Sequence, residues 1–283
     1  MIESGVKRAV VGMEDPNPLV KGRGIESLKA AGVDVRVNVL EKECRRINEA
    51  FCKYITERMP FVILKTASTL DGKIATRKGA SKWITGEVSR HFVHRLRNEV
   101  DGILVGIGTI LRDDPMLTAR IRGGRDPYRI VLDSGLQIPE RARILKGSPS
   151  RVIVVTTRRG SKEKTARLEE RGVRVLFVGL HRGRVDLKAC LRRLAEAGIV
   201  TLLVEGGSEV NGAFLDARAI DKFFHFLAGR WIGDPKAFGI FGGMGIRKLE
   251  DAIPLREIRI RKMGEDFLLE GYVGKGADPC SQG

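Results

Sequence analysis

The chain has 283 residues, of which 42% are hydrophobic, and a formal net charge of +16 at pH 7. This length and hydrophobic share allow a sizeable core, in one large domain or two unequal ones, and exclude an intrinsically disordered chain. The surplus of lysine and arginine favours anionic partners such as phosphate groups, nucleotides or nucleic acid, without choosing between them. Mixed-charge stretches such as RGSKEKTARLEERGVR are equally typical of a solvated, ion-paired surface.

The opening residues and the cysteines bear on the cellular compartment. The opening MIESGVKRAVVGMEDPNP lacks the apolar segment of a signal peptide, and no window of about 18 residues is apolar and uncharged. The cysteines, Cys44, Cys52, Cys190 and Cys280, have no spacing typical of a disulfide framework or a zinc site. We therefore expect a cytoplasmic protein in a reducing compartment, with residues 276–283 as a tail without regular structure.

The first sixty residues predict a small α/β unit. A strand at 8–13 is followed by a turn rich in Pro and Gly, a helix at 25–32, a strand at 33–39 and one further helix at 41–55. About fifty residues of this kind are too few for a typical independent domain. A boundary is expected near Pro60, because the residue before a proline disfavours helical backbone.

After Pro60, apolar runs that predict buried strands alternate with helical patterns. Their near-continuous apolarity is typical of strands buried on both faces of a parallel sheet. The runs are FVILKTAS, GILVGIGT, YRIVLDS, RVIVVTT, VRVLFVG and VTLLVEGG. Amphipathic helices are expected at 87–100 and 186–198. The segments DKFFHFLAG, REIRIRKMG and DFLLEGYV predict antiparallel strands that finish a mostly parallel sheet, so the predicted fold class is α/β.

Two strand-to-helix turns could hold an anionic ligand. In GILVGIGTILRDDP, Gly106, Gly108 and Thr109 follow a strand, and glycines there let backbone amides approach a phosphate. This is not the dinucleotide fingerprint, because Leu111 stands where a third glycine is needed. In LLVEGGSEVNGAF, Glu205 and two glycines end a buried strand just before a helix, where ligands of open α/β sheets gather. Plain turns would explain both segments as well.

Arginine, histidine and tryptophan add further candidates. Arg97 and Arg120 lie near these turns, and guanidinium groups match phosphate oxygens in two-point contacts, although most arginines of so basic a chain lie on the surface. His91 and His94 could share a metal, but no cysteine or carboxylate cluster accompanies them, so we expect a polar helical face and no metal. Trp83, in GASKWITG, is by itself best explained as a partly buried core side chain in a loop.

Several stretches together resemble the reductase half of the bifunctional riboflavin-biosynthesis deaminase/reductase. They are LKTASTLDGKIAT, SKWIT, LVGIGTILRDDPMLTAR, RIVLDS and VEGGSEVNGAF, in family order between about Pro60 and Val273. EDPNPLVKGRGIESLKAAGVDV and INEAF resemble the end of that family's deaminase domain, without its zinc-binding part. The resemblance implies a deaminase remnant without deaminase activity at 1–58 and a reductase domain with a dihydrofolate-reductase-like fold at 59–275.

The resemblance also implies an activity: NADPH-dependent reduction of the ribosyl group of 5-amino-6-(5-phosphoribosylamino)uracil to a ribityl chain, by a cytoplasmic homodimer without membrane or nucleic-acid partners. NADPH would contact Ala67, Trp83, Thr109, Asp113, Ser134, Gly206, Gly207, Ser208, Glu209, Val210, Asn211, Gly212 and Ala213. The substrate would contact Ser81, Arg97, Leu117, Arg120 and Glu205. Lys65 and Glu205 are the expected catalytic pair, because hydride delivery to an imine is eased by protonation and polarisation. Trp83 would be a wall that keeps water from the cofactor.

Other functions stay open. A related reductase acts on the 2,5-diamino pyrimidinone before deamination, and its pocket would differ at one exocyclic group. A non-catalytic, basic nucleic-acid-binding protein would keep the fold with an emptied cofactor site, but intact Lys65, Glu205, Gly206 and Gly207 argue against it. Apolar surface left uncovered on the N-terminal unit could also make the enzyme inactive by itself.

Overall fold

The computed structural model describes residues 1–274, which fall into two compact units. The smaller unit covers Met1–Phe61 and the larger one begins at Val62. No helix in this part of the chain is long and apolar enough to cross a membrane. The segment expected as a tail, 276–283 with Cys280, lies outside the described residues.

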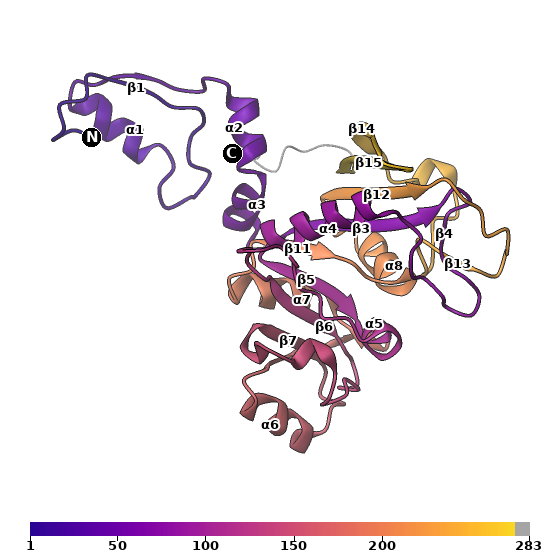
Figure 1. Ribbon diagram of the computed structural model, residues 1–283. Coiled ribbons are helices and arrows are strands. Elements are labelled where there is room, and N and C mark those ends of the chain that lie inside the picture. Colours follow the sequence, from indigo (N-terminus) through magenta and orange to yellow (C-terminus); the bar gives the residue numbers. More distant parts are fainter. Residues whose placement is uncertain (275–283) are drawn as a thin grey trace. The chain divides into compact units, whose positions relative to one another are not determined.

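The smaller unit combines short parallel strands with short helices (Figure 1). Its elements are β1 (Arg8–Val10), α1 (Arg23–Ala30), β2 (Asp34–Arg36), α2 (Glu41–Ile47) and α3 (Glu49–Glu57), and β1 pairs with β2. The single helix expected at 41–55 is wrong: Asn48 leaves helical backbone at φ −105° and ψ 13°. Its side-chain amide donates to the carbonyl oxygen of Cys44 at 2.8 Å, an alternative to helical bonding that asparagine offers. Cys52 is disulfide-bonded, although the cysteine spacing did not indicate it.

A nine-stranded sheet forms the frame of the larger unit, in the order β14-β15-β12-β3-β11-β5-β6-β7-β8. The strands are β3 (Phe61–Thr69), β5 (Gly102–Gly106), β6 (Tyr128–Leu132), β7 (Val152–Thr156), β8 (Arg174–Phe177), β11 (Thr201–Val204), β12 (Lys222–Ala228), β14 (Leu255–Met263) and β15 (Asp266–Val273). Neighbours from β11 to β8 pair in parallel, as does β12 with β3, whereas β15 is antiparallel to β12 and β14. The expected mostly parallel sheet with an antiparallel finish is confirmed.

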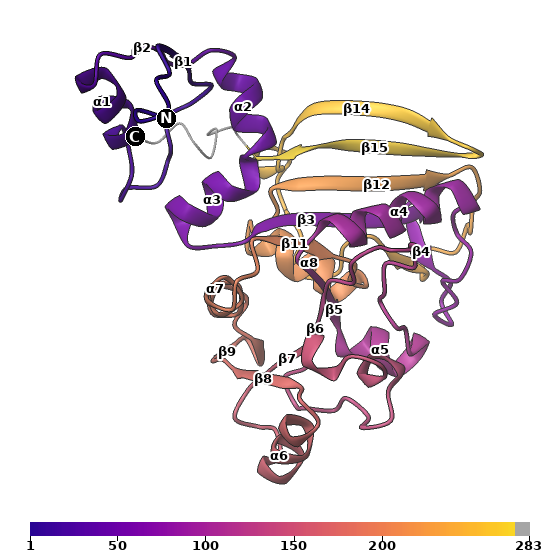
Figure 2. The same ribbon diagram turned by 60° about the vertical axis from the view of Figure 1, so that its left-hand side comes forward.

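Helices follow several strands of this sheet and pack against it. They are α4 (Glu87–Glu99), α5 (Ile107–Asp113), α6 (Lys162–Glu170), α7 (Leu187–Glu196) and α8 (Ser208–Asp216), with short 3₁₀ turns at Arg143–Leu145, Pro149–Arg151 and Leu249–Asp251. α4 packs Val93 and Leu96 against Leu203 of β11 and Phe226 of β12, and Figure 2 shows it lying along β3. Burial of such side chains contributes about 1.5–3 kcal/mol each, so α4 is fixed firmly to this part of the sheet.

Several small elements had no clear sequence signal. β4 (Lys73–Ala75) pairs with β13 (Phe238–Gly239), and β9 (Leu180–His181) pairs with β10 (Arg184–Val185), both antiparallel. The charged stretch after β7 forms α6, whose first turn is capped by the hydroxyl of Ser161, which accepts from the Lys164 amide at 3.2 Å. The strand expected over GILVGIGT ends at Gly106, because α5 starts at the next residue.

A close backbone contact holds the segment 240–245 against α8. A Cβ atom on Gly212 of α8 would overlap the carbonyl oxygen of Gly242, so only glycine fits there. The Gly242 amide donates to the carbonyl oxygen of Ser208 at 2.8 Å, and Asn211 Nδ2 donates to that of Ile240 at 3.0 Å. The first turns of α8 are therefore braced from outside by this segment.

The substitution Gly212→Ala should lower the free energy of unfolding by about 2 kcal/mol or more, because the new methyl group must displace the backbone at Gly242. Gly108→Ala is the matched control: Gly108 is an exposed helical glycine whose added Cβ would meet nothing within 4 Å. The control should change stability by less than about 1 kcal/mol. Urea unfolding followed by circular dichroism compares the two, and equal stabilities would contradict the close contact.

Candidate active site

Three charged side chains meet near the carboxyl end of β11. Glu205 directly follows β11, Lys65 lies on β3 and Arg97 lies on α4. Glu205 Oε1 accepts from Arg97 Nε at 2.7 Å, Oε2 accepts from Arg97 Nη2 at 2.9 Å, and Lys65 Nζ lies 3.9 Å from Oε2. The side chains of Glu205, Arg97 and Lys65 are only 10%, 13% and 18% exposed, so water screens these ion pairs weakly.

Burial and neighbouring charges determine how this group is protonated. Burial by itself raises the pKa of Glu205, but the charge and hydrogen bonds of Arg97, together with the charge of Lys65, lower this pKa to about 2. Burial lowers the pKa of Lys65; Glu205 opposes that change and Arg97 adds to it. Glu205 therefore stays ionised at neutral pH, and Lys65 gives up its proton more easily than an exposed lysine.

Hydrogen bonds to His225 hold the strand that carries Lys65. Thr66 Oγ1 lies 2.7 Å from His225 Nδ1 and Ser68 Oγ lies 3.3 Å from Nε2, across the parallel pair of β3 and β12. Burial, and then the charge of Lys65, lowers the pKa of His225 and favours its neutral ring. Since neighbouring residues of a strand point to opposite faces, these contacts fix β3 from the face away from Lys65.

The segment after α5 passes beside Arg97 in strained backbone. Arg97 Nη1 donates to the carbonyl oxygen of Thr118 at 3.2 Å. Leu117 and Arg120 both have φ 54°, in the left-handed region that residues other than glycine rarely adopt and that often marks functional sites. Leu117 is buried at 4% exposure, whereas Arg120 is exposed. Of these two expected substrate residues, Arg120 can reach a ligand with its side chain, whereas Leu117 can contact one only through its backbone.

His94 lies one helical turn before Arg97 on α4, close to the same charges. Its ring Nδ1 is buried without a hydrogen-bond partner. Burial lowers the pKa of His94, Arg97 and Arg120 lower it further, and Glu205 opposes them. Sequence reasoning placed His94 on a polar helical face; its three-residue spacing from Arg97 was the signal that could have associated it with the site.

Trp83 is an exposed side chain in the loop before α4. The residue is 66% exposed and its backbone is left-handed, with φ 68°. The Arg90 guanidinium lies 4.4 Å from the centre of its ring, within cation–π range, and Arg230 Nη1 donates to its carbonyl oxygen at 3.1 Å. The interpretation of Trp83 as core is therefore wrong. Ser81, two residues earlier, is partly buried.

The two glycine-containing turns follow neighbouring strands and both pack on α8. A Cβ atom on Gly106 would come within 2.7 Å of Val210 Cγ2, and one on Gly206 within 2.5 Å of Val210 Cβ. A Cβ on Gly207, directly before α8, would meet nothing within 4 Å. The first amides of a helix lack partners within it, so open space there suits an anion. Gly106 and Gly206 therefore let Val210 of α8 pack closely, and Gly207 is the glycine of these turns with open space beside it.

The other expected cofactor residues differ in what they can offer. Ala67 lies on β3 in register with Phe226 of β12. Thr109 lies in the first turn of α5 and is partly buried, whereas Asp113 ends α5 and is exposed. The Ser134 hydroxyl, after β6, accepts from the Val185 amide at 3.1 Å. Ala67 lies in the second half of β3, Thr109 and Asp113 lie in the helix that follows β5, and Ser134 follows β6. These residues are therefore spread along the edge of the sheet where the parallel strands end.

Within α8 the expected cofactor residues divide into two kinds. Glu209 is exposed and pairs with Arg184 at 3.3 Å, and Ser208 and Ala213 are partly buried. Asn211 is 1% exposed and engaged by Ile240, and Gly212 is covered by Gly242, so both brace the turn. Among residues 1–274, no three His, Cys, Asp or Glu side chains come together as a metal site would require.

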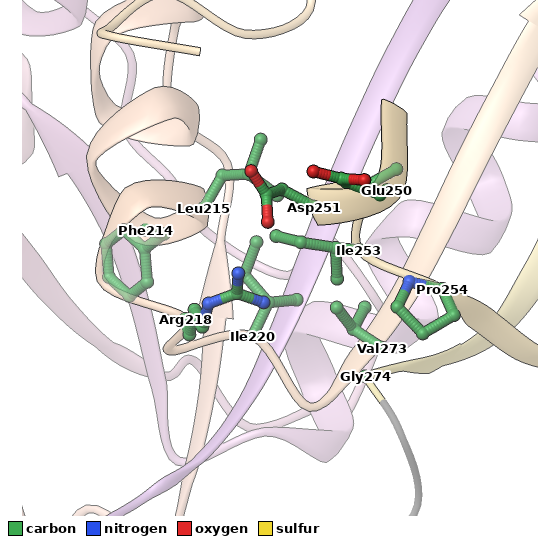
Figure 3. Close-up of a pocket in the computed structure, with 11 residues that line it drawn as sticks. Phe214, Leu215, Arg218, Ile220, Glu250, Asp251, Ile253, Pro254, Val273 and Gly274 are labelled. Atoms are coloured by element: carbon green, nitrogen blue, oxygen red, sulfur yellow. The ribbon is translucent and has the colours of Figure 1, made fainter. Parts of the chain in front are cut away.

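A separate cavity of about 390 Å³ lies where α8 ends, β12 begins and β15 ends (Figure 3). Its lining combines apolar side chains such as Phe214 and Ile220 with the charged Arg218, Glu250 and Asp251. None of the expected site residues lines it. The expected site is therefore distinct from this cavity.

The substitution Glu205→Gln should lower stability near neutral pH by about 3 kcal/mol, because it leaves buried Arg97 and Lys65 without a counter-charge. The pKa of Glu205 falls from 4.5 to about 2 on folding, so its carboxylate stabilises the fold above pH 4.5 and this contribution is lost as the pH falls towards 2. The stability difference between wild type and variant, measured by denaturation at a series of pH values, should therefore shrink below pH 4.5.

Glu209→Gln is the control, since that carboxylate lies four residues later, in the first turn of α8, but is 76% exposed in its pair with Arg184. Its loss should change stability little at any pH. A wild-type to Glu205→Gln difference that stays constant down to about pH 3 would contradict the buried pair.

Comparison with known proteins identifies the family. Residues 60–269 match the RibD C-terminal domain. The riboflavin biosynthesis protein RibD of Aquifex aeolicus is 41% identical over 270 residues, covering 95% of this chain and 73% of the relative. The corresponding protein of Actinobacillus pleuropneumoniae is 38% identical, covering 96% and 73%.

Solved structures agree with this assignment. Acinetobacter baumannii RibD, form 1, matches with a TM-score of 0.86 at 30% identity, over 97% of this chain and 75% of that one. The Thermotoga maritima diaminohydroxyphosphoribosylaminopyrimidine deaminase/5-amino-6-(5-phosphoribosylamino)uracil reductase matches with a TM-score of 0.80 at 36% identity, over 96% and 72%. The chain therefore belongs to the RibD family of riboflavin-biosynthesis proteins and carries its C-terminal reductase domain.

Proposed function

We propose that the protein reduces the ribosyl group of 5-amino-6-(5-phosphoribosylamino)uracil to a ribityl chain, with NADPH as reductant. The observation that carries this proposal is the shielded group of Lys65, Glu205 and Arg97, on the same sheet edge as the glycine turns. A buried lysine with a lowered pKa, held beside a fixed carboxylate, is typical of catalytic sites. The Thermotoga maritima relative, 36% identical, is named for this reduction.

The site's own residues have distinct tasks in this proposal. The glycine turns would hold the pyrophosphate of NADPH, which would supply the hydride. Lys65 holds or releases a proton at Nζ beside the substrate's imine nitrogen, and its lowered pKa makes that release easier than for an exposed lysine. The ionised Glu205 stabilises the positive charge that a protonated imine carries. Arg97 positions that carboxylate with two hydrogen bonds.

The phosphate of the substrate needs cationic groups that are not already engaged. Three nitrogen atoms of Arg97 donate to Glu205 and to the Thr118 carbonyl, so Arg97 acts mainly by positioning its neighbours. Arg120 is exposed beside them, and its strained backbone is the kind of conformation retained at binding sites. Ser81 adds a hydroxyl from the loop before α4. Arg120 is therefore the arginine proposed to contact the phosphate directly.

We also propose that residues 1–58 correspond to the end of the family's deaminase domain and that the reductase works as a cytoplasmic homodimer. The chain spans about three quarters of the length of the relatives it matches. β14 is the outermost strand of the sheet, and its Ile258 and Ile260 are 50% and 64% exposed. Exposed isoleucine side chains on an edge strand are costly to leave in water, which supports contact with a second copy.

The purified protein should oxidise NADPH when the deaminated substrate is added, as followed by the loss of nicotinamide absorbance. Lys65→Met should lower kcat by about a hundredfold or more, because it removes the proton at Nζ. Turnover of the 2,5-diamino pyrimidinone alone would move the assignment to the reductase that acts before deamination. Turnover of neither substrate would contradict the proposal.

The chain has two tryptophans, which allow the proposed cofactor wall to be tested separately. In a Trp231→Phe variant, NADPH should quench Trp83 fluorescence, because the indole would lie beside the nicotinamide. In a Trp83→Phe variant, the remaining Trp231, 76% exposed, should respond weakly and the KM for NADPH should rise severalfold. Equal quenching in the two variants would contradict a role for Trp83 at the cofactor.

A further inference from the structure

His94 is an unsatisfied polar side chain in an otherwise well-bonded site. No described residue bonds either nitrogen of its ring, and Nδ1 is buried. Buried polar groups in folded proteins almost always have a partner, so an orphaned one indicates a partner that comes from elsewhere. His94 precedes Arg97 by one turn of α4, which places the imidazole on the side of the helix that carries the ion-paired guanidinium.

Positive charge dominates the surroundings of this ring. Arg97 and His91 face it from α4, Arg120 from the segment after α5, and Glu205 from the end of β11. Glu205 is already neutralised by Arg97 and Lys65. Arg90, one turn earlier, is engaged elsewhere, with the Trp83 ring and the Thr85 carbonyl oxygen. A further proton on His94 is therefore disfavoured until an anion arrives.

We propose that His94 is a binding residue for the phosphate group of the substrate and that it takes up a proton when this doubly charged anion binds beside Arg97 and Arg120. The inference rests on the proposed function, because it takes the anion to be the substrate's phosphate. A dianion within about 4–6 Å reverses the repulsion from the two arginines and stabilises the imidazolium. The protonated ring then has two N–H donors, and the phosphate supplies the missing acceptor.

The proposal makes substrate binding depend on pH through one identified group. In the free protein, burial and then the charges of Arg97 and Arg120 lower the pKa of His94, which favours the neutral ring. An anion that raises this pKa on binding binds more tightly at lower pH. As the pH rises from the pKa of His94 in the free protein to its pKa in the bound protein, the affinity falls by up to about tenfold per pH unit. At pH values above both pKa values the affinity no longer depends on pH, because His94 is neutral in both states.

Nuclear magnetic resonance of protein labelled with ¹³C in its histidine rings tests this directly. The ring signals are titrated from about pH 5 to pH 8 without anion, with sodium sulfate and with ribose 5-phosphate. Sulfate stays doubly charged over this range, so its own titration cannot produce the effect. We expect the signal that disappears in His94→Asn to titrate at a higher pH when either anion is present.

His91→Asn is the matched control, because His91 is exposed on the same helix, one turn earlier. It should leave the anion-dependent shift and the pH dependence of sulfate affinity unchanged, whereas His94→Asn should abolish that pH dependence. Should His94→Asn fail to fold, His94→Gln provides the assignment. A titration of His94 that is identical with and without anion would overturn the proposal, and so would an equal shift with sodium chloride at the same ionic strength.

The experiment contains neither NADPH nor turnover, so its result is separable from that of the reductase assay. Reduction of the pyrimidine without an anion-dependent shift of the His94 titration would support the proposed function and contradict this inference. An anion-dependent shift without NADPH oxidation would support the anion site and contradict the proposed reductase activity.

Discussion

The two-point ion pair between Arg97 and Glu205 is the interaction on which the site depends. It joins α4 to the end of β11, and the remaining bond of Arg97 to the Thr118 carbonyl draws the segment after α5 to the same place. α4 can hold its arginine there because Val93 and Leu96 anchor the helix on the sheet. Hydrophobic packing thus decides where the guanidinium lies, and the guanidinium decides where the carboxylate and the neighbouring loop lie.

The charges around this pair do not balance. One ionised carboxylate, Glu205, serves Arg97 and Lys65, while Arg120 and His94 lie close by. Burial lowers the pKa of both Lys65 and His94, and the positive charge of Arg97 lowers both further. An anionic ligand removes the excess, so binding and protonation are physically coupled here. The net charge of the chain does not reveal this local excess of positive charge, because the excess depends on which charged groups are buried together.

The fold could be predicted from the sequence where burial alone decides structure. β5, β6, β7 and β11 lie in near-continuous apolar runs, and such runs form strands buried on both faces. The helix predicted over 41–55 is interrupted at Asn48, whose side chain bonds the Cys44 carbonyl oxygen. The spacing of apolar residues carries no information about such a local bond. At the site, Arg97 and Glu205 were both expected, but as separate substrate contacts. That they bind each other depends on the packing of α4 across β11, which no local pattern contains.

Leu117 and Asn211 show why a motif residue need not contact the ligand with its side chain. Both were expected in the site, yet Leu117 is buried in the core and Asn211 is bonded to the segment 240–245. Because Asn211 and Gly212 hold that segment, the shape of the glycine turn before α8 depends on residues some thirty positions further along the chain. A substitution in 240–245 would therefore alter the proposed cofactor turn without touching it, since the turn keeps its form only while both sides of α8 are packed.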